Sequence, residues 1–158
     1  MILNLFKRKE SVHLITSELH DEKTFYSALD RDLHASKSSV LIESPFLTAR
    51  RINNLRPLLQ KLVSRGVKII VNTRDPKEQE GILFYEAHKG VAILQEIGVK
   101  VLYTGNHHRK IVICDRTTLW EGSLNILSQN DSCEIMRRIK SEELAVEMLK
   151  FTKLEKYL

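Results

Sequence analysis

Two basic residues, His108 and Lys110, stand two positions apart before the apolar run Ile111-Val112-Ile113. Residues two apart in a strand project to the same face, so the imidazole and the ammonium would lie side by side. An anionic phosphate fits this pair, because the ammonium screens its charge while the imidazole attacks phosphorus or passes a proton. The segment Gly122-Ser123-Leu124-Asn125 follows a strand end and adds a hydroxyl and an amide. Its glycine would let the backbone approach a ligand closely.

The spacing His108-x-Lys110-x4-Asp115, then six residues, then Gly122-Ser123-x-Asn125, resembles the signature motif of the phospholipase D superfamily. The likeness extends from about residue 22 to residue 158. Three further segments resemble the small single-motif endonucleases of that family, namely Ser44-Pro45-Phe46, the helix-to-strand step at 65–69, and Glu134 before a strand. Phospholipases of the family carry two motifs in a longer chain, so the resemblance points to the nuclease branch.

The resemblance implies a mechanism that one copy of the motif cannot complete. In-line displacement at phosphorus needs a nucleophile on one side and an acid at the leaving oxygen on the other. Family members bring two motifs together across a two-fold axis, and a homodimer with a composite active site would supply the second His108. One imidazole would form a phosphohistidine while the other protonates the leaving hydroxyl. This chemistry requires neither a metal nor a cofactor.

The resemblance also assigns roles to individual residues. The implied catalytic residues are His108, Lys110, Asp115, Ser123, Asn125 and Glu134. Lys110, Ser123 and Asn125 would bind the phosphate, and Glu134 would accept from the far nitrogen of His108. Asp115 is more structural than chemical in the family. Arg74 follows a strand's carboxyl end and is a further substrate-binding candidate.

The elements that must position these residues are strands alternating with helices. The runs at 40–42, 67–71 and 111–113 are apolar without alternation, as in strands covered on both faces. Apolar stripes predict helices over about 22–35, 52–66, 84–97 and from Ser141, which is a plausible N-cap. Pro57 must either kink the second helix or open its main part. The pattern predicts an α/β fold with a mixed, mostly parallel sheet flanked by helices on both faces, the phospholipase D/nuclease fold.

Composition agrees with this interpretation. The 158 residues suit a single phospholipase D-like nuclease domain, with residues 1–10 as a flexible N-terminus, and 42% hydrophobic content fills one core. A charge of +5 suits a polyanion such as nucleic acid, with DNA favoured over RNA. Cys114 and Cys133, placed in strands, indicate reduced thiols and a cytoplasmic location. Neither a signal peptide nor a membrane span is apparent.

Several alternatives remain beside these assignments. A zinc site from His107, His108, Cys114 and Asp115 is disfavoured, because Lys110 would repel a cation and no CxxC or HxxxH spacing occurs. His107 is interpreted as a rim or packing residue, and Trp120 as a core residue rather than a base-stacking one. The arginines at 50, 51 and 56 could line a groove but are more often solvated. Functionally, a phospholipid head-group hydrolase or transferase, or a module working with a helicase or recognition partner, stays open.

Overall fold

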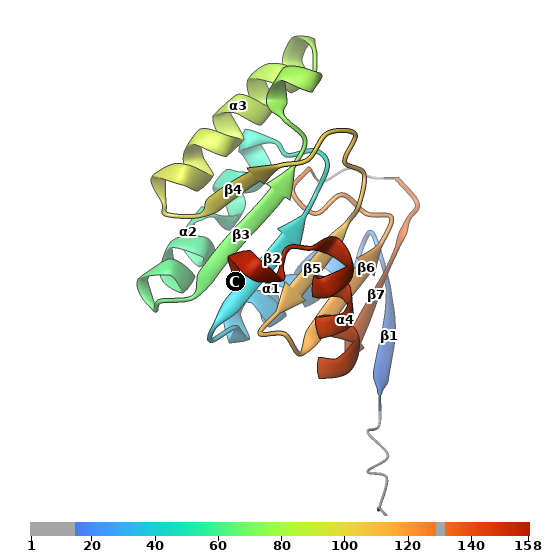
Figure 1. The fold of residues 1–158 in the computed structure, drawn as a ribbon. Coiled ribbons are helices and arrows are strands. Elements are labelled where there is room, and N and C mark those ends of the chain that lie inside the picture. The colour runs from blue at the N-terminus through green and yellow to red at the C-terminus, as the bar shows by residue number, and fades with distance from the viewer. Residues whose placement is uncertain (1–14, 129–131) are drawn as a thin grey trace, which may run out of the picture.

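The computed structural model describes residues 15–128 and 132–158, and within them seven strands form one mixed sheet (Figure 1). The strands are β1 (Thr16–Asp21), β2 (Ser39–Glu43), β3 (Lys68–Thr73), β4 (Lys100–Tyr103), β5 (Ile111–Cys114), β6 (Thr118–Gly122) and β7 (Ile135–Lys140). Their order across the sheet is β1-β7-β6-β5-β2-β3-β4.

The predicted α/β class and mixed sheet are confirmed, but the sheet is not mostly parallel. Only β2 with β3 and β3 with β4 pair in parallel, and the other four neighbouring pairs in the described sheet are antiparallel. The parallel half is the half joined by helical crossovers, as parallel strands require. β5 and β6 are instead joined by a short turn, which forces them to run antiparallel.

Helices cover both faces of the sheet, as predicted (Figure 1). They are α1 (Phe25–Ala35), α2 (Ala49–Ser64), α3 (Gly81–Glu96) and α4 (Glu142–Thr152), with short 3-10 turns at Pro76–Glu78 and Glu155–Tyr157. Alternate strand residues enter two separate cores: Val40 and Ile42 pack on the side of α1, α2 and α3, whereas Leu41 packs on the side of α4. The continuous apolar run of β2 therefore reflects burial on both sides.

The helix ends follow local chemistry. Thr48 begins α2 by accepting a hydrogen bond from the Arg51 backbone nitrogen at 3.2 Å, so Pro57 lies inside the helix and does not open it. Ser141 caps α4 by accepting from the Leu144 nitrogen at 3.3 Å, which confirms the predicted N-cap.

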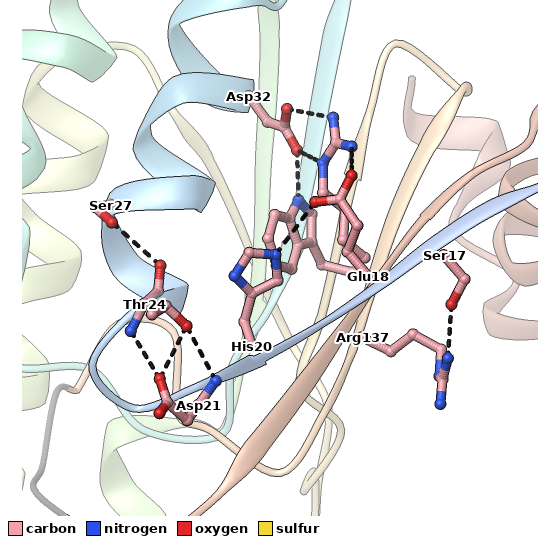
Figure 2. A network of polar contacts seen from close by, with 10 residues as sticks. Ser17, Glu18, His20, Asp21, Thr24, Ser27, Asp32 and Arg137 are labelled. Atoms are coloured by element: carbon pink, nitrogen blue, oxygen red, sulfur yellow. Dashed lines mark hydrogen bonds and ion pairs between the residues drawn. The ribbon is translucent and has the colours of Figure 1, made fainter.

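The edge strand β1 was not anticipated, and a polar network ties it to the rest of the fold (Figure 2). Asp32 of α1 accepts from Arg138 Nε at 2.7 Å and Nη2 at 2.8 Å, and from Trp120 Nε1 at 2.8 Å. Arg138 also donates to Glu18 of β1 at 3.4 Å, and the His20 ring lies 5.0 Å from that of Trp120. Trp120 is fully buried, which confirms its core assignment.

The cysteines are partly as expected. Both are free, and burial raises the pKa of Cys114 in β5 to about 12. Cys133 is exposed and precedes β7, so its assignment to a strand was wrong, because the apolar pattern begins only at Ile135. The N-terminal segment expected to be flexible, 1–10, lies outside the described residues. In the described part of the chain, no helix is both long and apolar enough to cross a membrane.

Removing the Asp32 carboxylate should destabilise the fold, because Arg138 and the Trp120 indole would lose their shared acceptor. We expect Asp32→Ala to lower the free energy of unfolding by about 2–4 kcal/mol in urea denaturation. Glu147→Ala removes the same charge from an exposed position of α4 and should change it by less than about 0.5 kcal/mol. Equal effects of the two substitutions would contradict this role of Asp32.

Candidate active site

The strand directions bring the predicted site residues to one edge of the sheet. β5 runs antiparallel to β2 and β6, so its amino end lies beside the carboxyl ends of both. β7 begins at the same edge, because it runs antiparallel to β6. The segments that gather there are the end of β2, the end of β3, residues 107–110, residues 122–125 and Glu134.

His108 and Lys110 form the contact that the sequence predicts. Lys110 Nζ lies 2.9 Å from His108 Nδ1 and 3.3 Å from Nε2, and it donates to the His108 carbonyl at 2.9 Å. Lys110 is buried, whereas His108 is exposed. Both ring nitrogens lie within reach of the ammonium, so the imidazole and the ammonium are side by side, as their two-residue spacing predicts.

Charged and aromatic side chains surround this pair. Burial lowers the pKa of Lys110, nearby Glu134 opposes that effect, and Arg74 adds to it. The Arg74 guanidinium lies 5.5 Å from the Phe46 ring centroid, and Phe46 meets the His108 ring edge-to-face at 6.4 Å. Arg74 therefore lies at the rim of the site, as its position after β3 predicts.

Glu134 does not have the neighbour that the resemblance implied. Within residues 15–128 and 132–158, its carboxylate accepts from the Ser132 hydroxyl, and its backbone nitrogen donates to Glu22 at 3.4 Å. It interacts electrostatically with Lys110 rather than through a hydrogen bond with His108. The family role of Glu134 remains a prediction.

Gly122 and Ser123 both contact strand β7. A Cβ on Gly122 would lie 2.9 Å from Met136 Cα, so the backbone of β7 occupies the space that any larger residue needs. This contact, not a ligand, accounts for the glycine in this structure. The Ser123 hydroxyl accepts from the Ile135 nitrogen at 3.2 Å and lies 3.4 Å from its carbonyl oxygen. Its role toward phosphate is likewise a prediction.

The turn at Asn125 is held by Tyr26, which the sequence analysis did not single out, and by Arg51, for which it predicted a different role. Tyr26 donates its hydroxyl proton to the Asn125 carbonyl at 2.8 Å, and Arg51 Nε donates to the Ile126 carbonyl at 3.3 Å. The side-chain oxygen of Asn125 is buried and has no hydrogen-bond partner among the described residues. The backbone of this turn is fixed while the amide keeps capacity for a ligand.

Asp115 lies away from the histidine, at the other end of β5. Its carboxylate accepts from the backbone nitrogens of Lys37, Ser38 and Ser39 and from the Ser38 hydroxyl, at 2.8–3.1 Å. The length of β5 separates it from Lys110 by roughly 16 Å. The carboxylate therefore holds the start of β2, which suits a structural role, and a part for Asp115 in the reaction stays a prediction. Burial acts to raise its pKa, but these hydrogen bonds outweigh burial and lower it.

The second histidine, His107, faces a buried polar group. It is 3% exposed, burial lowers its pKa, and the carboxylate of Glu43 opposes that effect. Glu43 is fully buried and accepts from Asn72 Nδ2 and Arg109 Nη2, both at 2.8 Å. The sequence analysis did not single out Glu43 or Asn72. Nothing local in the sequence signals their partner Arg109.

The three helix arginines have different environments. Arg51 is buried against Asp30 and Tyr26, Arg56 pairs with Glu96 at 3.0 Å, and Arg50 is exposed. Arg51 thus stabilises the turn at Asn125 through its hydrogen bond to the Ile126 carbonyl. The described residues hold no group of three or more His, Cys, Asp or Glu placed to bind a metal ion.

Asp115→Asn should weaken the fold in a pH-dependent manner. Because the folded-state pKa of Asp115 lies below the ordinary 3.8, its stabilising effect is complete above that value and is lost as pH falls through the folded pKa. We expect a loss of about 1–2 kcal/mol at pH 7, allowing for solvent screening. The loss should shrink in acid. Urea denaturation at several pH values measures it, with exposed Glu147→Gln as control; a loss that persists undiminished in acid would refute the assignment.

Known proteins share this arrangement of strands and helices. The family model described as cardiolipin synthase, PLD-like domain matches residues 29–154, whereas no curated protein matches the chain. Nuc, a phospholipase D family member from Salmonella typhimurium, is 18% identical with a TM-score of 0.70, covering 87% of this chain and 91% of its own. NucT from Helicobacter pylori is 15% identical with a TM-score of 0.71, covering 89% and 94%.

A third similar structure is TrmBL2, an archaeal chromatin protein with a novel mode of DNA binding. It is 16% identical with a TM-score of 0.59, and the match covers 95% of this chain but 54% of TrmBL2. At such identities the likeness shows the fold alone. The family model, however, spans most of the chain and includes the whole motif from His108 to Asn125. The chain therefore belongs to the phospholipase D-like family.

Proposed function

We propose that this protein is a metal-independent nuclease that hydrolyses phosphodiesters through a phosphohistidine in a homodimer. The observation that carries the proposal is the contact of exposed His108 with the buried ammonium of Lys110 at 2.9 Å. This contact supports the roles of His108 as nucleophile and Lys110 as phosphate-binding cation, at the edge where the Asn125 side-chain oxygen has no hydrogen-bond partner among the described residues. Family membership supports phosphodiesterase activity in general.

The reaction proceeds in two displacements. In the first, a neutral His108 forms a P–N bond as the P–O bond to the leaving hydroxyl breaks, and the protonated His108 of the partner subunit gives its proton to that oxygen. In the second, this now neutral imidazole takes a proton from water, whose oxygen attacks phosphorus and breaks the P–N bond. Lys110 and Asn125 hold the non-bridging oxygens. Two inversions give overall retention at phosphorus.

Nucleic acid is the proposed substrate, with DNA the first to test. The charge of +5 favours a polyanion, and the position of Arg74 over the Phe46 ring, beside His108, supports a contact of its guanidinium with a phosphate backbone. Among the similar structures, TrmBL2 binds DNA. The matching family model is that of a cardiolipin synthase domain, so lipid phosphodiesters are the second candidate class, served by the same residues.

Cleavage should survive chelation of metals and depend on His108. We expect the wild-type protein to cut single-stranded or duplex DNA in excess EDTA, and His108→Ala to lose at least about 1000-fold in rate, because nucleophile and acid disappear together. Lys110→Ala should lose about 100-fold or more.

His34→Ala, which removes an exposed histidine at the end of α1, is the matched control and should retain full activity. Vesicles containing cardiolipin, and RNA, are assayed in parallel. Activity that requires added magnesium would refute metal independence. Cleavage of lipid but not of nucleic acid would reject the nuclease in favour of a phospholipid hydrolase.

A composite site makes an inactive subunit dominant over an active one. When wild-type protein is co-refolded with an equal amount of His108→Ala, half of the wild-type chains enter mixed dimers that hold one imidazole. We expect activity per wild-type chain to fall to about half. Co-refolding with a dimer-competent surface variant, Glu147→Ala, measures any loss from the procedure itself. Undiminished activity per wild-type chain, with mixed dimers verified by mass, would rule out the shared site.

A further inference from the structure

The segment that carries His108 and Lys110 lies beyond the end of a strand. The last paired residues of the β2–β5 ladder are Glu43 and Ile111, so residues 107–110 continue the chain past the sheet. His108 and Lys110 contact each other, whereas His107 and Arg109 both interact with the Glu43 carboxylate. The interactions of the second pair therefore bear on where the first pair lies.

Arg109 is attached to the two neighbouring strands through a buried carboxylate. Its Nη2 donates to Glu43 Oε1 at 2.8 Å, and Asn72 Nδ2 of β3 donates to the same oxygen at 2.8 Å. The Asn72 side-chain oxygen in turn accepts from the Thr104 hydroxyl at 3.0 Å. These contacts link the ends of β2, β3 and β4 to the one residue that stands between His108 and Lys110.

Stability alone does not account for this arrangement. Glu43 is fully buried, and its second oxygen has no hydrogen-bond partner among the described residues, so part of its desolvation is uncompensated. A buried ion pair is commonly no more stabilising than apolar residues of similar volume. The three β2 residues before Glu43 are apolar, so an apolar side chain would continue the strand's own pattern. What the pair does supply is a fixed position for Arg109.

We propose that Glu43 is a positioning residue for the reaction: by holding the Arg109 guanidinium it fixes the backbone between His108 and Lys110 and so aims both side chains at the phosphate. This inference rests on the proposed function for its kinetic part. Its structural part, the orientation of the His108 ring, does not. A displacement of the nucleophile by about 1 Å is enough to slow an in-line reaction about 100-fold.

The kinetic test compares Glu43→Gln, Arg109→Met and the double variant Glu43→Leu/Arg109→Met on a small chromogenic phosphodiester. Each should lower kcat by about 10–100-fold while KM changes less than about threefold, because binding groups remain but alignment is lost. The double variant should be no slower than Arg109→Met, since both variants lose the same Glu43–Arg109 ion pair.

The double variant removes both charges, so it stays folded if the single variants do not. Glu96→Gln, which breaks the surface pair with Arg56, is the matched control and should keep wild-type kcat. Wild-type kcat in the folded variants, or a loss carried wholly by KM, would overturn the proposal.

The structural test does not need activity. In a carbon–proton correlation NMR spectrum, the His108 ring signal is assigned by its absence in His108→Ala. We expect it to shift and broaden in Glu43→Gln and Arg109→Met, while the signals of His34 and His88 stay in place. If the wild-type protein cleaves no phosphodiester, the proposed function fails. The spectrum alone then tests whether Glu43 and Arg109 position His108. An unchanged His108 signal in the variants overturns it.

Discussion

The antiparallel pairing of β5 with β2 is the constraint on which the site depends. A parallel β5 would carry Lys110 and His108 to the opposite edge, away from the ends of β2 and β3. Because β5 runs back along β2, its amino end meets their carboxyl ends, and the β5–β6 hairpin returns Gly122 to the same edge. The two halves of the motif thus meet through strand direction alone. No long-range loop is needed to bring them together.

Much of this could be predicted from the sequence, because the signals are local. Apolar runs predicted β2, β3 and β5, stripes predicted the four helices, and Ser141 predicted the start of α4. The contact of His108 with Lys110 was predicted from their spacing of two residues, and it forms although both residues lie just before β5. Asn125 and Arg74 were predicted from their places after strands, and both lie at the edge where the motif gathers.

What could not be predicted depends on partners far apart in the chain. β1 has a polar sequence, and five of its six residues are exposed. Its strand state arises from pairing with β7, more than a hundred residues later. The excess of antiparallel pairs is likewise a matter of topology rather than of apolar pattern. Glu43 meets Arg109 only when β2 and β5 align. The reason for Gly122 is hidden in the same way, since β7 takes the space beside it.

The hairpin turn at Asp115 has a consequence for which histidine contacts Lys110 in the candidate site. Asp115 and Arg116 both adopt positive φ angles, 51° and 57°, in the turn that joins β5 to β6. The Asp115 carboxylate also accepts hydrogen bonds from the backbone nitrogens of residues 37–39, where β2 begins. These bonds fix the register of β5 against β2. A slip of one residue would turn every side chain of the strand to the other face. His107 and Arg109 would then replace His108 and Lys110 on the side of the candidate site. His107 and His108 are adjacent in the chain. The Asp115 carboxylate, at the opposite edge of the sheet, therefore helps to determine which of the two lies beside Lys110.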